Sequence, residues 1–320
     1  METLLLRRSD VIQLLDVAAV IPLLREAFCA YSHERTIAAQ RARYPLSSLG
    51  TVMVLAPGLN ARIPAYTVKV HAKFPDQQPA IRGVLQLYDL QTGQLLAVMD
   101  STYITAVRTG IAGALAAHEL ARSDATTIAV VGAGAQGRHL LQSLARMRQV
   151  KRVQVFDTNT KTAEIYAHEL SAALRLPIAV APSIAVAVAH ADIIFTATWS
   201  RQPFLFPEMV SPGAHISTIG PDEPGKCELD ATLIRQSLFV CDDRELAVTM
   251  GAIGGASLSS EAIAAELGDI LNAAHPGRTS PEQLTVYGGV GVAFQDLVAA
   301  WHVYQQAQHH QIGTSIDFLY

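Results

Sequence analysis

The chain has 320 residues, of which 50% are hydrophobic and 16% are charged, with a formal net charge of -4 at pH 7 and a pI near 6.2. Because one domain usually takes about 100–200 residues, this length predicts two domains. The composition excludes a disordered chain and favours a soluble α/β protein, and the slightly acidic balance excludes a broad basic surface for nucleic acid or an anionic membrane.

The cysteines and the apolar stretches indicate the cellular compartment of the protein. Cys29, Cys227 and Cys241 are odd in number and lack metal-ligand spacing, so we expect no disulfide framework, no metal site and a cytoplasmic protein. The leading leucine run is shorter than the roughly 7–15 apolar residues of a signal peptide. The stretch 176–199 is interrupted by proline and polar residues, whereas a membrane helix needs about 20 apolar residues. We therefore expect neither secretion nor a membrane span.

The first third of the chain combines helices and strands. Residues 11–33 have apolar positions at helical spacing and predict one or two amphipathic helices. Residues 51–100 consist of short β-rich runs and include a hairpin with Gly93 in its turn, which predicts an antiparallel sheet. An alanine-rich helix is expected next, over 104–121.

After Ser123 strands and helices alternate. Apolar strands are expected over 126–134, 150–157, 191–198, 213–220 and 237–243, with helices over 135–149 and 162–174. This rhythm predicts a parallel sheet covered on both faces by helices. The last helix, over 293–310, is long and amphipathic and is expected to return to the first domain.

The segment VVGAGAQG follows the first of these strands and opens a helix. It places Gly132, Gly134 and Gly137 in the pattern G-x-G-x-x-G. There the first glycine makes a tight turn, the second lets the backbone approach a pyrophosphate, and the third lets helix and strand pack closely. We predict a dinucleotide site, against the alternative that the glycines serve packing alone.

Asp157 ends the next strand, 20 residues after Gly137. A carboxylate at this point can accept hydrogen bonds from ribose hydroxyls and repels a 2′-phosphate. The sequence therefore predicts NAD(H) rather than NADP(H) as the cofactor. The alternative is that Asp157 only caps the end of its strand.

The segment IGPDEPGKCEL, residues 219–229, also follows a strand. It places Asp222, Glu223 and Lys226 among prolines and a glycine. Ligands of open α/β sheets bind at the carboxyl ends of the strands, and proline restricts the backbone. The segment is either a solvated turn or a rigid frame that aims one acid at a substrate.

Together with QRARYPL, VKVHAKFP, DSTYITAVRTGIAGALAA and LTVYGGVGVAFQDL, these motifs make the chain resemble the ornithine cyclodeaminase/mu-crystallin family over nearly its whole length. That family includes ornithine cyclodeaminase, an NAD-linked alanine dehydrogenase and ketimine or cyclic-imine reductases. The resemblance implies a homodimer joined through the β-sheets of the non-nucleotide domains, with the active site in a cleft between domains. The expected fold class is α/β, with a Rossmann-type NAD-binding domain over 121–299. Residues 1–120 and 300–320 are expected to form an α+β substrate-binding and dimerisation domain.

The resemblance also implies roles for single residues. Arg43 and Lys69 match positions that bind the substrate carboxylate, and Lys69 also faces the reacting carbon. Asp222 matches the catalytic acid/base, which leaves Glu223 as a solvated neighbour. Val290 resembles a residue that contacts the substrate. The implied cofactor contacts, beyond the three glycines and Asp157, are Arg108, Ala135, Gln136, Thr198, Lys226 and Gly289.

The chemistry of such a reaction sets the same requirements. Hydride transfer between a nicotinamide and an α-amino acid leaves an imine, so the site needs a carboxylate clamp and a group that exchanges a proton with nitrogen. We therefore expect an NAD(H)-dependent oxidoreductase acting on the C–N bond of a small α-amino or α-imino acid, of alanine dehydrogenase or imine reductase type. The basic surroundings expected of Lys69 also admit a short dicarboxylate such as iminosuccinate; they are Arg41, Arg43, His71, Lys73 and Arg82.

Two alternatives stay open. An ornithine cyclodeaminase needs an acid for the terminal ammonium group, and cyclodeaminases carry a glutamate in the run before the lysine strand, where this chain has Met53 or Val54. The other alternative is a mu-crystallin-like protein that binds the nucleotide without catalysis.

Overall fold

The computed structural model describes residues 2–35, 38–39, 41–46, 50–74, 77 and 79–318. The chain divides into two compact units. Unit 1 consists of residues 1–108 and 292–320, and unit 2 of residues 109–291. The first division therefore falls inside helix α3 (Ser101–Leu120), upstream of the predicted boundary after residue 120. Among the described helices, none has the length and apolar character to cross a bilayer.

Unit 1 contains a seven-stranded mixed sheet in the order β15-β1-β6-β5-β4-β3-β2. The strands are β1 (Thr3–Leu6), β2 (Arg41–Leu46), β3 (Gly50–Gly58), β4 (Ala65–Lys73), β5 (Ile81–Asp89), β6 (Leu95–Asp100) and β15 (Thr314–Ile316). The antiparallel sheet predicted over 51–100 is present as β3 to β6, and β2, which was not predicted, extends it. Gly93 adopts the positive φ of +71° at the β5–β6 turn. The sheet is mixed because β1 pairs in parallel with β6.

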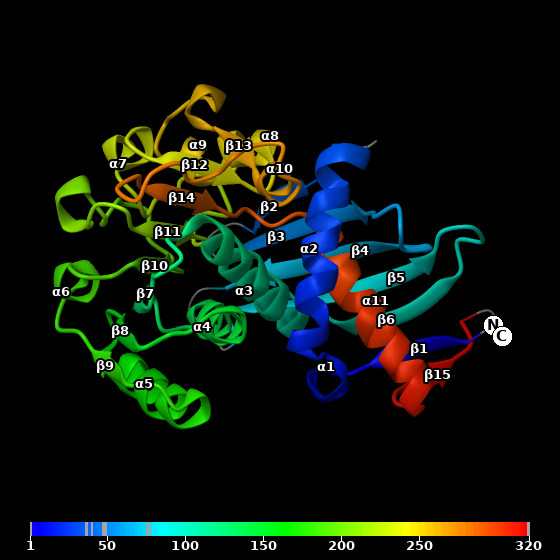
Figure 1. Cartoon of the computed structure of the whole chain (residues 1–320). Coiled ribbons are helices and arrows are strands. Elements are labelled where there is room, and N and C mark those ends of the chain that lie inside the picture. The colour runs from blue at the N-terminus through cyan, green and yellow to red at the C-terminus, as the bar shows by residue number, and fades with distance from the viewer. Residues whose placement is uncertain are drawn as a thin grey trace. The chain divides into compact units, whose positions relative to one another are not determined.

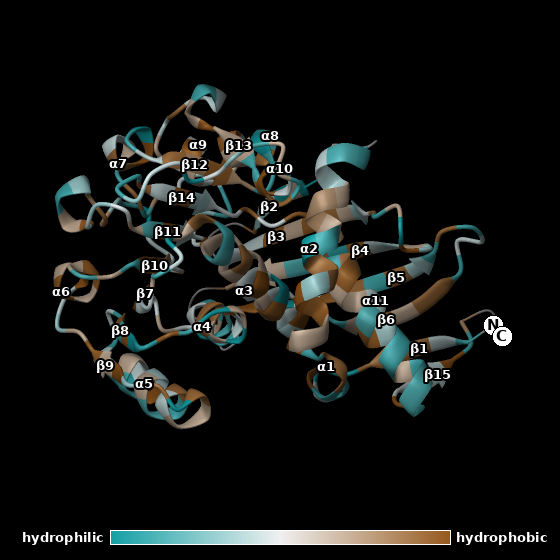
Figure 2. Ribbon diagram, in the orientation of Figure 1, coloured by the Kyte–Doolittle hydropathy of each residue, from teal (hydrophilic) through white to brown (hydrophobic). Residues whose placement is uncertain are grey.

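One long helix packs on this sheet, and a second long helix packs against the first. The predicted helix over 11–33 is two helices, α1 (Arg8–Leu14) and α2 (Val17–Glu34), because Asp16 begins α2 by accepting a hydrogen bond from the Ala18 amide. The last helix, α11 (Ala293–His310), belongs to unit 1 and crosses β3, β4 and β5 alongside α2 (Figure 1). It changes from mainly hydrophobic residues at its start to hydrophilic ones at its end (Figure 2).

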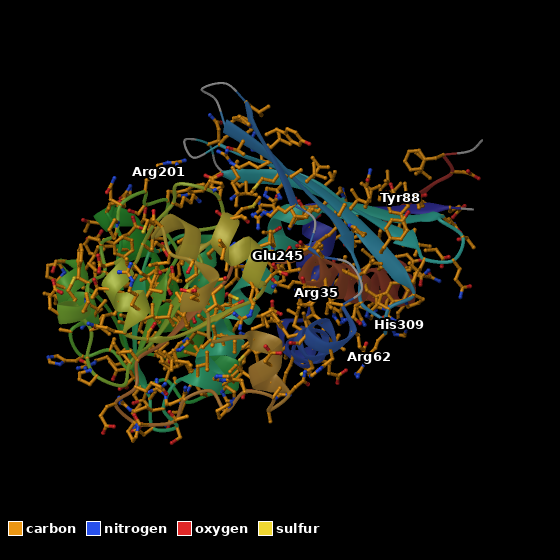
Figure 3. All side chains as sticks on the ribbon, turned by 90° about the horizontal axis from the view of Figure 1, so that it is seen from above. Arg35, Arg62, Tyr88, Arg201, Glu245 and His309 are labelled. Atoms are coloured by element: carbon orange, nitrogen blue, oxygen red, sulfur yellow. The ribbon has the colours of Figure 1, made fainter. Side chains whose placement is uncertain are left out.

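The sheet of unit 1 has two different faces, because successive side chains of a strand point to opposite sides. Burial alternates along β4, and its buried positions include Lys69, His71 and Lys73. The other face carries stacked Tyr66 and Tyr88, whose ring centroids are 5.0 Å apart; Tyr88 is labelled in Figure 3. Placing basic side chains on the buried face costs free energy, which indicates a function rather than a packing role.

Unit 2 contains an eight-stranded parallel sheet in the order β13-β12-β14-β11-β10-β7-β8-β9, the Rossmann-type sheet predicted from the sequence. Its strands are β7 (Thr127–Val131), β8 (Arg152–Phe156), β9 (Ile178–Val180), β10 (Ile193–Thr196), β11 (His215–Thr218), β12 (Leu238–Cys241), β13 (Ala265–Glu266) and β14 (Thr285–Gly288). The helices between them are α4 (Ala135–Met147), α5 (Thr160–Leu174), α6 (Ile184–Val188), α7 (Ala231–Arg235), α8 (Arg244–Thr249), α9 (Ala252–Gly255), α10 (Leu267–Leu271) and the 3₁₀ turns Pro207–Met209 and Ser260–Ala262.

The core of unit 2 explains why its strands read as continuous apolar runs. All four residues of β10 and of β11 are buried, as expected for strands with neighbours on both sides and helices on both faces. Polar groups that enter this core are hydrogen-bonded: the imidazole of His215 lies 2.9 Å from the hydroxyl groups of both Thr285 and Ser217. The polar residues that remain gather where the strands end.

Candidate active site

Strand order in unit 2 reverses between β7 and β10, because the chain first builds outward to β9 and then returns to place β10 on the other side of β7. Open α/β sheets bind ligands at such a switch point, outside the carboxyl ends of their strands. Five predicted site residues lie within four residues after these ends: Gly132, Asp157, Thr198, Asp222 and Gly289. The parallel sheet thus gathers at one edge residues that are far apart in the sequence.

The glycine loop has the geometry that its spacing predicts. Gly132 has a φ of +103°, and a Cβ atom there would lie 2.5 Å from the carbonyl oxygen of Ala197. A Cβ at Gly137 would collide with the carbonyl oxygen of Gly132, so this glycine lets α4 pack closely on β7. Gly134 differs, because it is exposed and a Cβ there would meet no described atom within 4 Å. The loop is therefore open at the position where a pyrophosphate backbone contact requires space.

Two more features fit a dinucleotide. Gln136, in the first turn of α4, has a buried Oε1 atom without a hydrogen-bond partner among the described residues, so a polar group is still required there. Asp157 accepts hydrogen bonds from the backbone amides of Ala133 (2.8 Å) and Asn159 (2.9 Å), which ties the end of β8 to the glycine loop. Asp157 therefore does cap local backbone, and its predicted contact with a ribose stays a prediction.

Glu228, at the end of the IGPDEPGKCEL segment, is the most heavily bonded side chain of this edge. Its carboxylate is 1% exposed and accepts hydrogen bonds at 2.6–3.3 Å from Thr196, Thr198, Thr218 and Gly220. Both the amide and the hydroxyl of Thr198 bind it. A buried carboxylate in this position fixes the ends of β10 and β11 to each other, and with them the start of the segment that carries Asp222.

Asp222 forms an ion pair with Lys226, whose Nζ atom lies 2.9 Å from Oδ1. The Asp222 side chain is 23% exposed, whereas that of Lys226 is 5% exposed. Lys226 also donates to the carbonyl oxygen of Gly220 and lies 4.1 Å from the ring centroid of Trp199. The acid nominated as acid/base is therefore accessible, and its partner lysine is held from several sides.

The burial of Glu223 differs from the prediction. The sequence predicts a solvated neighbour, but Glu223 is 5% exposed and its carboxylate lies 3.6 Å from the guanidinium of Arg201, which is labelled in Figure 3. The segment is folded so that Glu223 turns inward and Asp222 outward. Glu223 therefore anchors the loop.

A second buried acid holds the end of β14. Asp242, which follows β12, accepts hydrogen bonds from the Val290 amide (3.1 Å) and the Gly291 amide (2.6 Å). Gly291 has a φ of +93°, and a Cβ at Gly289 would lie 2.9 Å from the ring of Tyr287. The backbone of residues 289–291 is thus fixed, although the contacts predicted for Gly289 and Val290 stay predictions.

In unit 1, basic side chains share one face of the sheet. Because paired residues of antiparallel strands project to the same side, the pairs Arg43–Met53 and Leu55–Lys69 put Arg43 and Lys69 together. The side chains on this face that carry or can carry positive charge are Arg41, Arg43, Lys69, His71 and Lys73. Arg82 does not belong to this set, contrary to expectation, since it pairs with Ala72 and projects to the opposite face.

Lys69 is the most deeply placed of these cations. Its Nζ atom donates to Asp296 Oδ2 at 2.6 Å and to the Thr105 hydroxyl at 3.4 Å. Arg108 donates from Nε to Asp296 Oδ1 at 3.1 Å and from Nη1 to Gln295 at 2.8 Å. The side chains of Lys69, Arg108 and Asp296 are 1%, 5% and 0% exposed. Two cations therefore share one carboxylate.

Burial and charge act in opposite directions on this cluster. Burial lowers the pKa of Lys69 from 10.5 to about 7; Asp296 raises it, whereas Arg108 and Arg41 lower it. Burial raises the pKa of Asp296, but the charges of Arg108 and Lys69 outweigh it, so this pKa lies below its usual range. Asp296 is therefore ionised at neutral pH, and Lys69 titrates there.

Glu228, Asp242 and Asp296 are site residues that the sequence reasoning missed. Glu228 and Asp296 lie in the motifs IGPDEPGKCEL and LTVYGGVGVAFQDL; for Asp296, an acid within a mostly apolar run is a signal that could have indicated it. Asp296 is the first acid after the glycine-rich end of β14, and eleven other residues of α11 are buried. In the part of the chain that the structure describes, no group of His, Cys, Asp and Glu could hold a metal ion.

Comparison with known proteins gives a consistent result. An alanine dehydrogenase from Archaeoglobus fulgidus is 31% identical over 323 residues, covering 99% of both chains. The structure of an archaeal alanine dehydrogenase dimer with bound NAD superposes with a TM-score of 0.94 at 30% identity, covering 99% of this chain and 100% of that one. A Delta(1)-pyrroline-2-carboxylate reductase from Thermococcus litoralis, in complex with NADH and L-proline, has a TM-score of 0.93 at 29% identity, covering 98% and 100%.

These relatives are dehydrogenases and reductases that match along the whole chain, as the motifs predict. The sequence profile of the ornithine cyclodeaminase/mu-crystallin family matches residues 1–311. The chain belongs to the ornithine cyclodeaminase/mu-crystallin family.

Proposed function

We propose that this protein is an NAD(H)-dependent oxidoreductase that acts on the C–N bond of a small α-amino or α-imino acid, in the manner of an alanine dehydrogenase or an imine reductase. The observation that carries the proposal is the place of Asp222. It follows β11, two strands from the glycine loop of β7 and on the same edge of the sheet. An accessible acid at that edge can exchange a proton next to a bound nucleotide.

The cofactor is proposed from the loop and from the relatives. Gly134 leaves space at the start of α4, the Oε1 atom of Gln136 has a vacant acceptor position, and Asp157 repels a 2′-phosphate. NAD and NADH are bound in the two solved structures described above. When bound, the nicotinamide would supply or accept the hydride.

The residues of the chain would bind the substrate and move its proton. Lys69 and Arg43 hold the carboxylate, since guanidinium and ammonium groups are its natural partners. Asp222 exchanges a proton with the substrate nitrogen, and Lys226 keeps the carboxylate of Asp222 in place at 2.9 Å. Glu228 and Asp242 keep the strand ends rigid, so that the reacting groups do not have to be ordered during each turnover.

The substrate is proposed to lack a terminal ammonium group. The strands β2, β3 and β4, which carry Arg43 and Lys69, contain no aspartate or glutamate at all. Met53, fully buried, projects on the same face as Arg43 and His71. An ornithine side chain would find cations and a thioether there, which disfavours cyclodeaminase chemistry.

The proposal is tested by following NADH absorbance with the purified protein. Pyruvate, glyoxylate and oxaloacetate are supplied with NADH and ammonia, and cyclic ketimines with NADH alone; alanine, aspartate and ornithine are supplied with NAD. We expect NADH oxidation with at least one oxo acid or imine and no proline from ornithine. If oxaloacetate is the preferred oxo acid, we infer that Arg41, His71 and Lys73 bind its second carboxylate. Turnover with none of these compounds would overturn the proposal.

We also propose a homodimer formed through the sheet of unit 1. The face opposite Lys69 bears a row of paired apolar side chains, and Val70 and Val84 on it are 39% and 46% exposed. Large exposed apolar surfaces mark interaction sites, and the similar alanine dehydrogenase forms a dimer. The double change Val70→Lys with Val84→Lys should produce monomers in light scattering, while Val186→Lys, an exposed valine of unit 2, should not. A dimer that survives the double change contradicts this interface.

A further inference from the structure

The charges around Lys69 do not balance. Lys69 and Arg108 each form their ion pair with the same acid, Asp296. Among the described residues no other carboxylate contacts either cation. With Asp296 ionised, the protonated cluster carries one positive charge in excess, in a place where the three side chains are at most 5% exposed.

Among the described residues, the side chains that contact the cluster bring no second carboxylate. From α3 come Arg108 and the neutral Thr105, from α11 come Asp296 and Gln295, and β2 contributes Arg41. The strand of Lys69 itself adds His71 and Lys73 on the same face, and the second arginine of β2, Arg43, lies there too. Among the described residues, the further titratable groups of β2 and β4 on this face are basic. The face also carries Asp89, the last residue of β5, which accepts hydrogen bonds from the turn residues Gln91 and Thr92.

An unbalanced buried charge is costly, and a lysine can avoid it by losing its proton. This is the direction seen for Lys69, whose pKa is lowered by burial to about 7 despite the contact with Asp296. A guanidinium group, in contrast, is not deprotonated in proteins. The single adjustable charge of the cluster is therefore that of Lys69.

We propose that Asp296 is a positioning residue that couples substrate binding to proton uptake. Shared with Arg108, it holds the Lys69 ammonium in place but leaves it one anion short, so that the substrate carboxylate and a solvent proton enter together. The proton adds to the neutral Nζ of Lys69, and the carboxylate then balances the new charge. This inference rests on the proposed function, in which Lys69 binds the carboxylate.

Asp296 then has two separable effects. Its charge favours the protonated form of Lys69, so Asp296→Asn should shift the titration of Lys69 to lower pH. Its length sets the place of the ammonium group, so Asp296→Glu should keep the titration near that of the wild type and still displace Nζ. Asp16→Asn is the matched control, because this carboxylate only caps α2 and asparagine caps equally well.

The experiment observes Lys69 directly. The chain has five lysines, so the ¹³Cε signals of lysine-labelled protein are few, and Lys69→Met assigns the signal of interest. In the wild type this signal should titrate near pH 7, and saturating pyruvate or oxaloacetate with NAD should move the midpoint upward by one pH unit or more, about a tenfold change in proton affinity. A midpoint that neither oxo acid moves overturns proton uptake.

Kinetics of the variants complete the test. For Asp296→Asn we expect KM for the oxo acid to rise on the order of 100-fold, with 1/KM falling at a lower pH than in the wild type. Asp296→Glu should raise KM with the same pH midpoint, and Asp16→Asn should change neither. If Asp296→Asn does not fold, the glutamate variant decides: an unchanged KM overturns the positioning role.

The outcomes separate this inference from the proposed function. Turnover of an oxo acid together with an unmoved Lys69 midpoint refutes the coupling and leaves the oxidoreductase. A midpoint that pyruvate or oxaloacetate moves, in a protein that turns over no amino or imino acid, refutes the oxidoreductase and leaves a carboxylate-binding site at Lys69.

Discussion

The ammonium group of Lys226 lies 2.9 Å from the carboxylate of Asp222, and it also lies 4.1 Å from the ring centroid of Trp199. The lysine side chain is 5% exposed and that of the aspartate is 23% exposed, so the pair presents only its acid to solvent. The ion pair within residues 222–226 thus holds the Asp222 carboxylate in a defined direction. The same ion pair orients Asp222 for the proposed proton transfer.

Asp222→Asn should abolish most turnover without removing the nucleotide site. The amide keeps the size of the side chain but cannot exchange a proton with nitrogen, and general acid–base catalysis contributes about 10²–10⁴-fold to rates. We expect a loss of this order in kcat, measured by NADH absorbance, with NADH affinity from fluorescence titration unchanged. Asp230→Asn, which changes the N-cap of α7 just after this segment and keeps a capping side chain, is the control. Retained turnover in Asp222→Asn would show that another group moves the proton.

Asp157→Ser should change the choice between the two nicotinamide cofactors. The carboxylate lies at the end of β8 beside the glycine loop, and a like charge against a 2′-phosphate is costly. The ratio of kcat/KM for NADH to that for NADPH should fall about tenfold or more, which corresponds to about 1.4 kcal/mol. A wild-type protein that uses both cofactors equally would contradict the role of Asp157.

Glu228→Gln should destabilise unit 2 and weaken cofactor binding. Both oxygens of the Glu228 carboxylate accept hydrogen bonds. A glutamine replaces one oxygen by an NH₂ group, and this donor would face the amide or the hydroxyl of Thr198, which also donate. Each buried group left unsatisfied costs about 1–3 kcal/mol. Urea unfolding should show this loss, and Glu208→Gln, an exposed glutamate, should not. Equal stability of both variants would mean that Glu228 is not required for the strand ends.

Lys69→Met should alter the way stability depends on pH. In the folded protein the pKa of Lys69 is lowered from 10.5 to about 7, so between these values the unfolded chain binds more protons. The lysine therefore makes the free energy of unfolding rise with pH through this window, by at most about 1.4 kcal/mol per pH unit. The stability of the wild type minus that of Lys69→Met should increase from pH 7 towards pH 10.

Urea unfolding of both proteins at several pH values measures this difference. Lys151→Met, which removes an exposed lysine, serves as the control. A difference between wild type and Lys69→Met that stays constant over the window would show that Lys69 does not titrate there.

The sequence predicts the nucleotide side well because its signals are local. The spacing of Gly132, Gly134 and Gly137 depends on turn geometry within a few residues, and the structure shows the positive φ and the close approach that this geometry requires. Alternation of strands and helices likewise predicts the parallel sheet, since each connection is short.

The buried acids could not be predicted in the same way. Asp296 meets Lys69 and Arg108 across 227 and 188 positions of sequence, through the packing of α11 on β4 and α3. The prediction that Glu223 is solvated is wrong for a similar reason, because its partner Arg201 comes from the loop after another strand. Hydrophobic pattern shows which face is buried, but it does not show which charged side chains meet there.

Isotope transfer distinguishes oxidoreduction at a C–N bond from every other use of NADH by this protein. Wild-type protein is incubated with NADH, ¹⁵N-ammonia and the oxo acid that supports the fastest NADH oxidation, and the amino acid product is analysed by mass spectrometry. We expect one ¹⁵N atom to be incorporated for each NADH consumed, and we expect Asp222→Asn to lose both ¹⁵N incorporation and NADH oxidation. NADH oxidation without ¹⁵N in an amino acid, or no oxidation with any oxo acid or cyclic ketimine, would contradict it.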